Sequence, residues 1–117
     1  MLVEIEKEYK VVDSNQIIVS VIVGEEQTGR IAIYLNDVQK IKEWNKIKNF
    51  FLGEGFKIRN QLLQIDTNVI ESNSDTNRTA VTYFLAGGEP TKKKFKFPEI
   101  VANDNESVFY RAKITLV

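Results

Sequence analysis

The chain contains no cysteine and no histidine among its 117 residues. The lack of cysteine removes disulfides, thiolate nucleophiles and thiolate metal sites. The lack of histidine removes the usual general base near neutral pH and the commonest metal ligand, which excludes Ser-His-Asp, Cys-His and His-ligated zinc chemistry. Only carboxylate-based or lysine-based catalysis is left. We therefore expect a protein that is not an enzyme and that has no cofactor and no bound metal.

Long apolar runs and a surplus of one charge are also missing. No segment approaches the roughly 18 apolar residues of a membrane-spanning helix, and the start MLVEIEKEYKVV has no apolar stretch of the kind that a secretory signal needs. The 16 basic residues balance the 16 acidic ones. Nucleic-acid binders usually carry a basic surplus, because phosphate contacts supply much of their affinity. We expect a cytoplasmic protein without a membrane span, and the charge balance argues against nucleic acid as the partner.

Length and composition indicate one folded domain over residues 1–117. The chain is 43% hydrophobic and 27% charged, close to the average for folded soluble proteins. Clusters of Gly, Asn, Asp and Ser divide it, and these residues favour turns because they tolerate positive φ or bond to their own backbone. The clusters cover residues 13–15, 24–29, 53–55, 72–77, 87–90 and 102–106.

Between these turns, apolar and polar residues alternate. Residues 3–11, 79–85 and 108–116 each place one set of apolar side chains on one face and polar side chains on the other. A period of two with many β-branched residues is typical of half-buried strands. We therefore predict a mainly antiparallel β-sandwich of about seven strands with immunoglobulin-like architecture. The alternative is an open β-barrel.

The segment from Ile17 to Val23 differs from these strands because it is apolar on both faces. This pattern is typical of a central strand that is covered on both sides. It also fits a strand whose outer face meets a partner.

Residues 37–52 have a different periodicity. Val38, Ile41, Trp44, Ile47 and Phe51 recur at spacings of three and four, with Asp37 as a candidate cap and Gly53 as a candidate stop. This spacing predicts a short helix within 37–52 that lies across one end of the sandwich. The competing interpretation makes residues 46–52 a strand.

The segment from Lys92 to Phe97 combines lysines with two phenylalanines. Rings that stack on bases and ammonium groups that meet phosphates are features of single-strand nucleic-acid binders. In the structural interpretation, Phe95 and Phe97 point into the core while Lys94 and Lys96 point to solvent. If this strand neighbours the first one, Glu4, Glu6 and Glu8 partly neutralise the lysines. If the two strands lie on separate sheets, the lysines form an unneutralised row and the nucleic-acid hypothesis gains support.

Four further lysines surround the only tryptophan, Trp44: Lys40, Lys42, Lys46 and Lys48. Tryptophan is enriched at binding hot spots when it is exposed. The ordinary alternative is that Trp44 belongs to the core. Trp44, Lys92, Lys94 and Lys96 are therefore the candidate binding-surface residues.

By elimination, the sequence favours a non-catalytic interaction or structural module, a subunit or accessory domain of a larger assembly that binds a protein partner or itself. The alternative is a β-barrel that binds single-stranded nucleic acid or an anionic ligand through residues 92–97. A third hypothesis is a carboxylate-dependent enzyme such as a glycosidase, which needs two acids facing each other across a cleft. Exposure of Phe95, Phe97 and Trp44 distinguishes the first two hypotheses.

Overall fold

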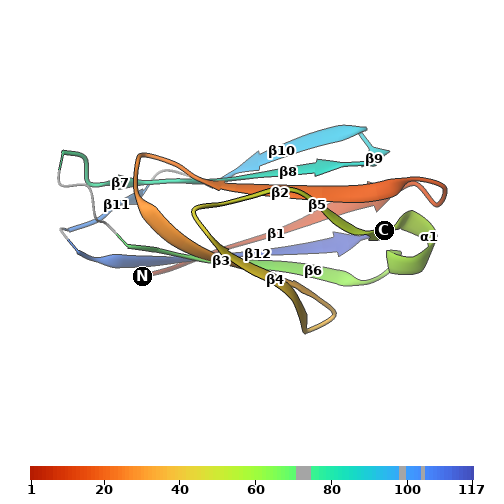
Figure 1. The fold of residues 1–117 in the computed structure, drawn as a ribbon, viewed down its shortest axis with the longest axis horizontal. Helices are drawn as coiled ribbons and strands as arrows, with labels where there is room; N and C mark the ends of the chain where they lie inside the picture. The colour runs from red at the N-terminus through yellow and green to blue at the C-terminus, as the bar shows by residue number, and fades with distance from the viewer. Residues whose placement is uncertain (71–74, 98–99, 104) are drawn as a thin grey trace.

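The computed structural model describes residues 1–70, 75–97, 100–103 and 105–117. Part of the turn expected over 72–77 and part of the one over 102–106 lie outside these residues. The described chain forms two principal sheets that pack face to face (Figure 1). The prediction of a mainly antiparallel β-sandwich is confirmed.

The larger sheet has six strands in the order β4-β3-β6-β12-β1-β9. Their bounds are β1 Leu2–Val11, β3 Thr28–Leu35, β4 Val38–Trp44, β6 Leu62–Ile70, β9 Gly88–Glu89 and β12 Ser107–Leu116. The first and last of the long strands are direct neighbours, and β1 pairs with β12 in parallel from Leu2 beside Phe109 to Tyr9 beside Leu116. The other pairings between described strands are antiparallel.

The smaller sheet has four strands in the order β10-β8-β2-β5. Their bounds are β2 Gln16–Val23, β5 Lys46–Glu54, β8 Val81–Ala86 and β10 Lys92–Lys96. Two short strands, β7 Arg78–Thr79 and β11 Ile100–Val101, pair separately. The described residues thus form more strands than the seven or so that we expected, partly because three of them have two residues each.

The core lies between the two sheets and follows the alternation in the sequence. In β12, Val108, Tyr110, Ala112, Ile114 and Leu116 are all buried, whereas the residues between them are exposed or half-buried. In β8, Val81, Tyr83 and Leu85 are buried, and Phe84 between them faces out. The strand faces predicted from the period of two are therefore correct.

The helix predicted within 37–52 is wrong, because this segment forms β4 and β5. Asn36 and Asp37 both have positive φ and make the turn that leads into β4, as a tight hairpin turn requires. The expected apolar stripe is not buried as a helix face would be: Val38, Trp44 and Phe51 are each about half exposed. The competing interpretation of 46–52 as a strand is the correct one.

Asn45 carries the chain from one sheet to the other between β4 and β5. Its φ is 67°, a conformation that asparagine tolerates better than most residues. Its N–H donates to the carbonyl of Gly29 at 2.7 Å, its side-chain Oδ1 accepts from the N–H of Gly29 at 3.0 Å, and its carbonyl accepts from the N–H of Val23 at 2.9 Å. The two sheets are joined at this corner, so the sandwich curls partly toward a barrel.

The one helix among the described residues is α1, Gly55–Ile58, which directly follows β5. A side chain at Gly55 would place its Cβ 2.0 Å from the carbonyl oxygen of Val12. The end of β5 can therefore approach the turn between β1 and β2 only because residue 55 is glycine.

Candidate functional site

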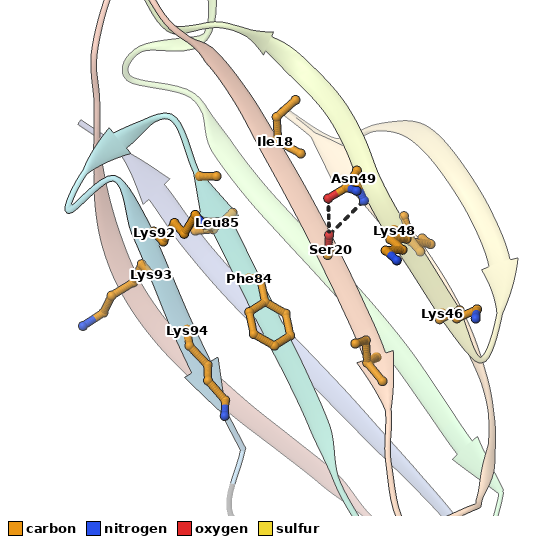
Figure 2. Close-up of a pocket in the computed structure, with 13 residues that line it drawn as sticks. Ile18, Ser20, Lys46, Lys48, Asn49, Phe84, Leu85, Lys92, Lys93 and Lys94 are labelled. Atoms are coloured by element: carbon orange, nitrogen blue, oxygen red, sulfur yellow. Dashed lines mark hydrogen bonds between the residues drawn. The ribbon is translucent and has the colours of Figure 1, made fainter.

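The outer face of the four-stranded sheet is hollowed into a groove of about 620 Å³. Figure 2 shows it from the solvent side. We call it the outer groove, and it is lined by residues of all four strands: Ile18, Ser20, Ile22, Lys46, Ile47, Lys48, Asn49, Phe84, Leu85, Ala86, Lys92, Lys93 and Lys94.

The floor of the outer groove is apolar because β2 is apolar on both faces. Ile17, Val19 and Val21 face the core and are fully buried, whereas Ile18 and Ile22 face outward. Ile22 is 44% exposed and Phe84 on the neighbouring strand is 38% exposed. The β2 segment is a central strand, as predicted, but no described element covers its outer face.

Ser20, the polar side chain that β2 contributes to this floor, is satisfied within the sheet. Its Oγ accepts the backbone N–H of Asn49 at 2.8 Å. Asn49 has φ 55° and lies where the register between β2 and β5 shifts, which marks a β-bulge. Because the Ser20 hydroxyl already has a partner within the sheet, the floor that β2 presents to a ligand is mainly hydrophobic.

Strand β10 forms one rim of the groove, with its side chains alternating as the structural interpretation required. Phe95 is 8% exposed and Phe97 is 1% exposed, and both belong to the core. Lys92 and Lys94 line the groove, and the Nζ of Lys94 lies 6.0 Å from the centre of the Phe84 ring. In Figure 2, Lys93 extends outward from the edge of the sheet. Phe95 and Phe97 are therefore not available for stacking on a ligand.

Strand β5 forms the opposite rim, where Lys46 and Lys48 line the groove (Figure 2). A second hollow of about 480 Å³ adjoins this rim and is lined by Glu43 together with the same two lysines. Glu43 forms no ion pair with either of them.

The outer groove carries positive charge from four lysines, Lys46, Lys48, Lys92 and Lys94, and none of its described lining residues is acidic. Within the described part of the chain, none of these lysines forms an ion pair. The acidic row Glu4, Glu6 and Glu8 lies on β1, which belongs to the other sheet. There, Asp66 and Glu4 contact Arg111, with Arg111 Nε 3.0 Å from Asp66 Oδ1, and this carboxylate raises the pKa of the guanidinium. The acidic row and the groove lysines therefore lie on different sheets, and Glu4 and Glu6 lie beside Arg111 and Lys113 of β12.

The predicted binding residues are only partly brought together. Lys92 and Lys94 line the groove, and Lys96 continues their row beside Thr82. Trp44 is 50% exposed, so it is not part of the core, but it lies on β4 and not among the groove residues. The guanidinium of Arg30 lies 5.4 Å from the centre of the Trp44 ring.

Sequence reasoning missed the apolar floor and the second rim as parts of one site. The signals were present: Ile17 to Val23 is apolar on both faces, and Phe84 alternates with buried neighbours. The sequence shows Lys46 and Lys48 only as neighbours of Trp44.

The described lining of the groove lacks the pair of acids that the glycosidase hypothesis requires. A glycosidase site needs two carboxylates across a cleft, and the described lining of the groove holds neither Asp nor Glu. Among the described residues, no three Asp or Glu side chains gather as metal ligands would. The described helix is far too short to cross a membrane.

Comparison with known proteins gives no relative: no family model, no curated protein and no solved structure matches this chain.

Proposed function

We propose that the protein is a non-catalytic interaction module that binds a protein partner through the outer groove. The observation that carries the proposal is the uncovered outer face of β2. A strand that is central in its sheet and apolar on both faces is ordinarily covered on both sides. In this protein, however, Ile22 on β2 is 44% exposed, and Phe84 on the neighbouring strand β8 is 38% exposed. Exposed apolar surface rimmed by polar residues is typical of a protein-interaction site.

The binding mode that this surface supports is docking on the face of the sheet. The edge strand β10 has lysines at most of its positions, and lysines on an edge oppose the addition of another strand. Face-to-face self-association through two copies of the groove would bring eight lysines together, four from each copy, so a partner of a different kind is favoured. A cytoplasmic location stays a prediction of the sequence.

The test compares two matched variants as immobilised baits. Phe84→Ser removes a ring that is 38% exposed from the groove floor, and Phe56→Ser removes a ring that is 57% exposed from α1, outside the groove. A genuine partner from the native host should bind the wild type and Phe56→Ser. Titration of the purified partner against Phe84→Ser should show about a tenfold or greater loss of affinity, as for a central hot-spot residue.

The two variants should melt cooperatively at similar temperatures, because both rings are substantially exposed. A partner that binds Phe84→Ser as tightly as the wild type would contradict the proposal. If the wild type instead forms concentration-dependent dimers that Phe84→Ser abolishes, the groove serves self-association and not a foreign partner.

A further inference from the structure

We infer that the partner presents an amphipathic α-helix with acidic residues along both margins of its apolar face. This inference rests on the proposed function and specifies the occupant of the outer groove. It follows from the width of the groove, from the position of its charges and from the chemistry of its floor.

The width of the groove fits a helix. The two lysine rims lie on β10 and β5, and β8 and β2 lie between them. Three spacings between neighbouring strands amount to about 14 Å. An α-helix with its side chains is about 10 to 12 Å across, so one helix can lie on the floor with its two margins beside the rims.

The position of the charges requires two rows of negative groups. Lys92 and Lys94 lie on one rim and Lys46 and Lys48 on the other, with Ile18 and Ile22 between them. A helix with an apolar stripe presents polar positions on both sides of that stripe, and carboxylates there would face both rims at once. The complement of this groove is therefore apolar in the middle and acidic on both sides.

A single nucleic-acid strand matches the groove less well. It carries one row of phosphates, which can follow one rim only, and its bases need aromatic surfaces on which to stack. Phe84 is the one aromatic ring among the groove residues, since Phe95 and Phe97 are buried in the core. A second copy of this chain that met the groove with its own groove would place lysine rims against lysine rims.

The length of the floor sets the size of the helix. From Ile18 to Ile22 the strand rises about 13 Å, which corresponds to about nine helical residues at 1.5 Å each. An interface of two to three helical turns is small, so we expect micromolar affinity and fast exchange, as in transient signalling complexes.

The experiment uses designed peptides of about 18 residues, long enough to form helix in water. The first has a leucine stripe flanked by glutamate on both sides. The second replaces the glutamates on one side with lysine. The third has the composition of the first in an order without an apolar face. Fluorescence anisotropy should show micromolar binding of the first peptide only, and raising the salt concentration should weaken that binding because exposed charges are screened.

Two double variants test the two rims, and a third serves as their control; each removes two positive charges. Lys92→Ser with Lys94→Ser and Lys46→Ser with Lys48→Ser should each weaken binding of the first peptide about fivefold or more, the loss expected for two exposed ion pairs. Lys40→Ser with Lys42→Ser is the matched control, because both lysines lie on β4 outside the groove. This control should bind like the wild type.

Equal binding of the scrambled peptide, or an equal loss in the control variant, would overturn the inference. Tighter binding of an oligothymidylate, dependent on Lys92 and Lys94 but not on Lys46 and Lys48, would assign the groove to single-stranded nucleic acid instead. If a host partner binds through Phe84 but the first peptide does not bind, the helix inference fails and the proposed function stands. If capture does not depend on Phe84, the proposed function fails as well.

Discussion

Replacing Tyr9 with phenylalanine removes one hydroxyl group from a site where it makes two hydrogen bonds. Tyr9 is 2% exposed. Its hydroxyl donates to the carbonyl of Pro90 at 2.8 Å and accepts the N–H of Gly88 at 2.8 Å. These hydrogen bonds link β1 to the connection between β8 and β10. In Tyr9→Phe the buried N–H of Gly88 would have no acceptor, which costs about 1 to 3 kcal/mol of the free energy of unfolding.

Tyr83 provides the matched control for this substitution. It is also fully buried, but no described group forms a hydrogen bond with its hydroxyl, and the hydroxyl of Thr67 is likewise without a hydrogen-bond partner. The Thr67 hydroxyl offsets part of the rise that burial causes in the pKa of Tyr83, but the geometry between the two oxygens falls short of a hydrogen bond. Because Tyr83→Phe strips no group of a partner, its free energy of unfolding at neutral pH should stay within about 0.5 kcal/mol of the wild type.

Urea unfolding followed by far-ultraviolet circular dichroism measures the difference between the two variants. With an m-value of about 2 kcal/mol/M, Tyr9→Phe should lower the midpoint by about 0.5 to 1.5 M, and Tyr83→Phe by less than about 0.3 M. The m-values should not change. If the two substitutions lower the midpoint equally, hydrogen bonding at Tyr9 is not the cause and the argument fails.

Two further perturbations test the sheet and its buried phenols. Deleting residues 113–117 removes the buried side chains Ile114 and Leu116, each of which contributes about 2 to 5 kcal/mol to the free energy of unfolding. The deletion should abolish the cooperative melt, because the whole free energy of unfolding of a small domain is about 5 to 15 kcal/mol. A transition near the full-length temperature would contradict this. Burial raises the pKa of Tyr83 and of Tyr9 above the ordinary value near 10, so the unfolded chain releases these protons at lower pH than the folded chain does. The free energy of unfolding should therefore be unaffected below about pH 10. Above that pH it should fall by up to about 1.4 kcal/mol per pH unit for each group. Urea titrations from neutral to alkaline pH should show a shallower fall for Tyr83→Phe, and an unchanged slope would refute this origin.

The strand faces could be predicted because alternation is a local property. A strand turns successive side chains to opposite faces, so the pattern of residues 108–116 alone specifies that Ile114 faces the core and Thr115 does not. The same logic identified Phe95 and Phe97 as core residues. Neither inference needs knowledge of which strands are neighbours.

The segment 37–52 misled this logic because its strands are irregular. The register between β3 and β4 shifts between Gln39 and Ile41, the chain changes sheets at Asn45, and a bulge lies at Asn49. These irregularities interrupt the alternation, so a clear period of two is not visible in the sequence. The apolar residues at spacings of three and four resemble a helical stripe, but they do not share a face, because Ile47 is buried whereas Trp44 and Phe51 are about half exposed. In the sequence, only the asparagines indicate the turns.

The candidate site could not be assembled from the sequence because strand order depends on contacts between distant residues. Lys46 and Lys94 are 48 positions apart in the chain (94 minus 46). They line one groove only because β8 and β2 lie between their strands in the sheet. Nothing local to either segment specifies that arrangement, whereas the apolar outer face of β2 is visible in the sequence.

The parallel pairing of β1 with β12 also determines how the molecule meets a mechanical load. Because Leu2 lies beside Phe109 and Tyr9 beside Leu116, a force that pulls the two chain ends apart slides these neighbouring strands past each other in opposite directions. The hydrogen bonds of the ladder then bear the force together, in shear, instead of opening one after another as in a zipper. If the protein is tethered by its ends within an assembly, the load falls first on the contact that links its two termini.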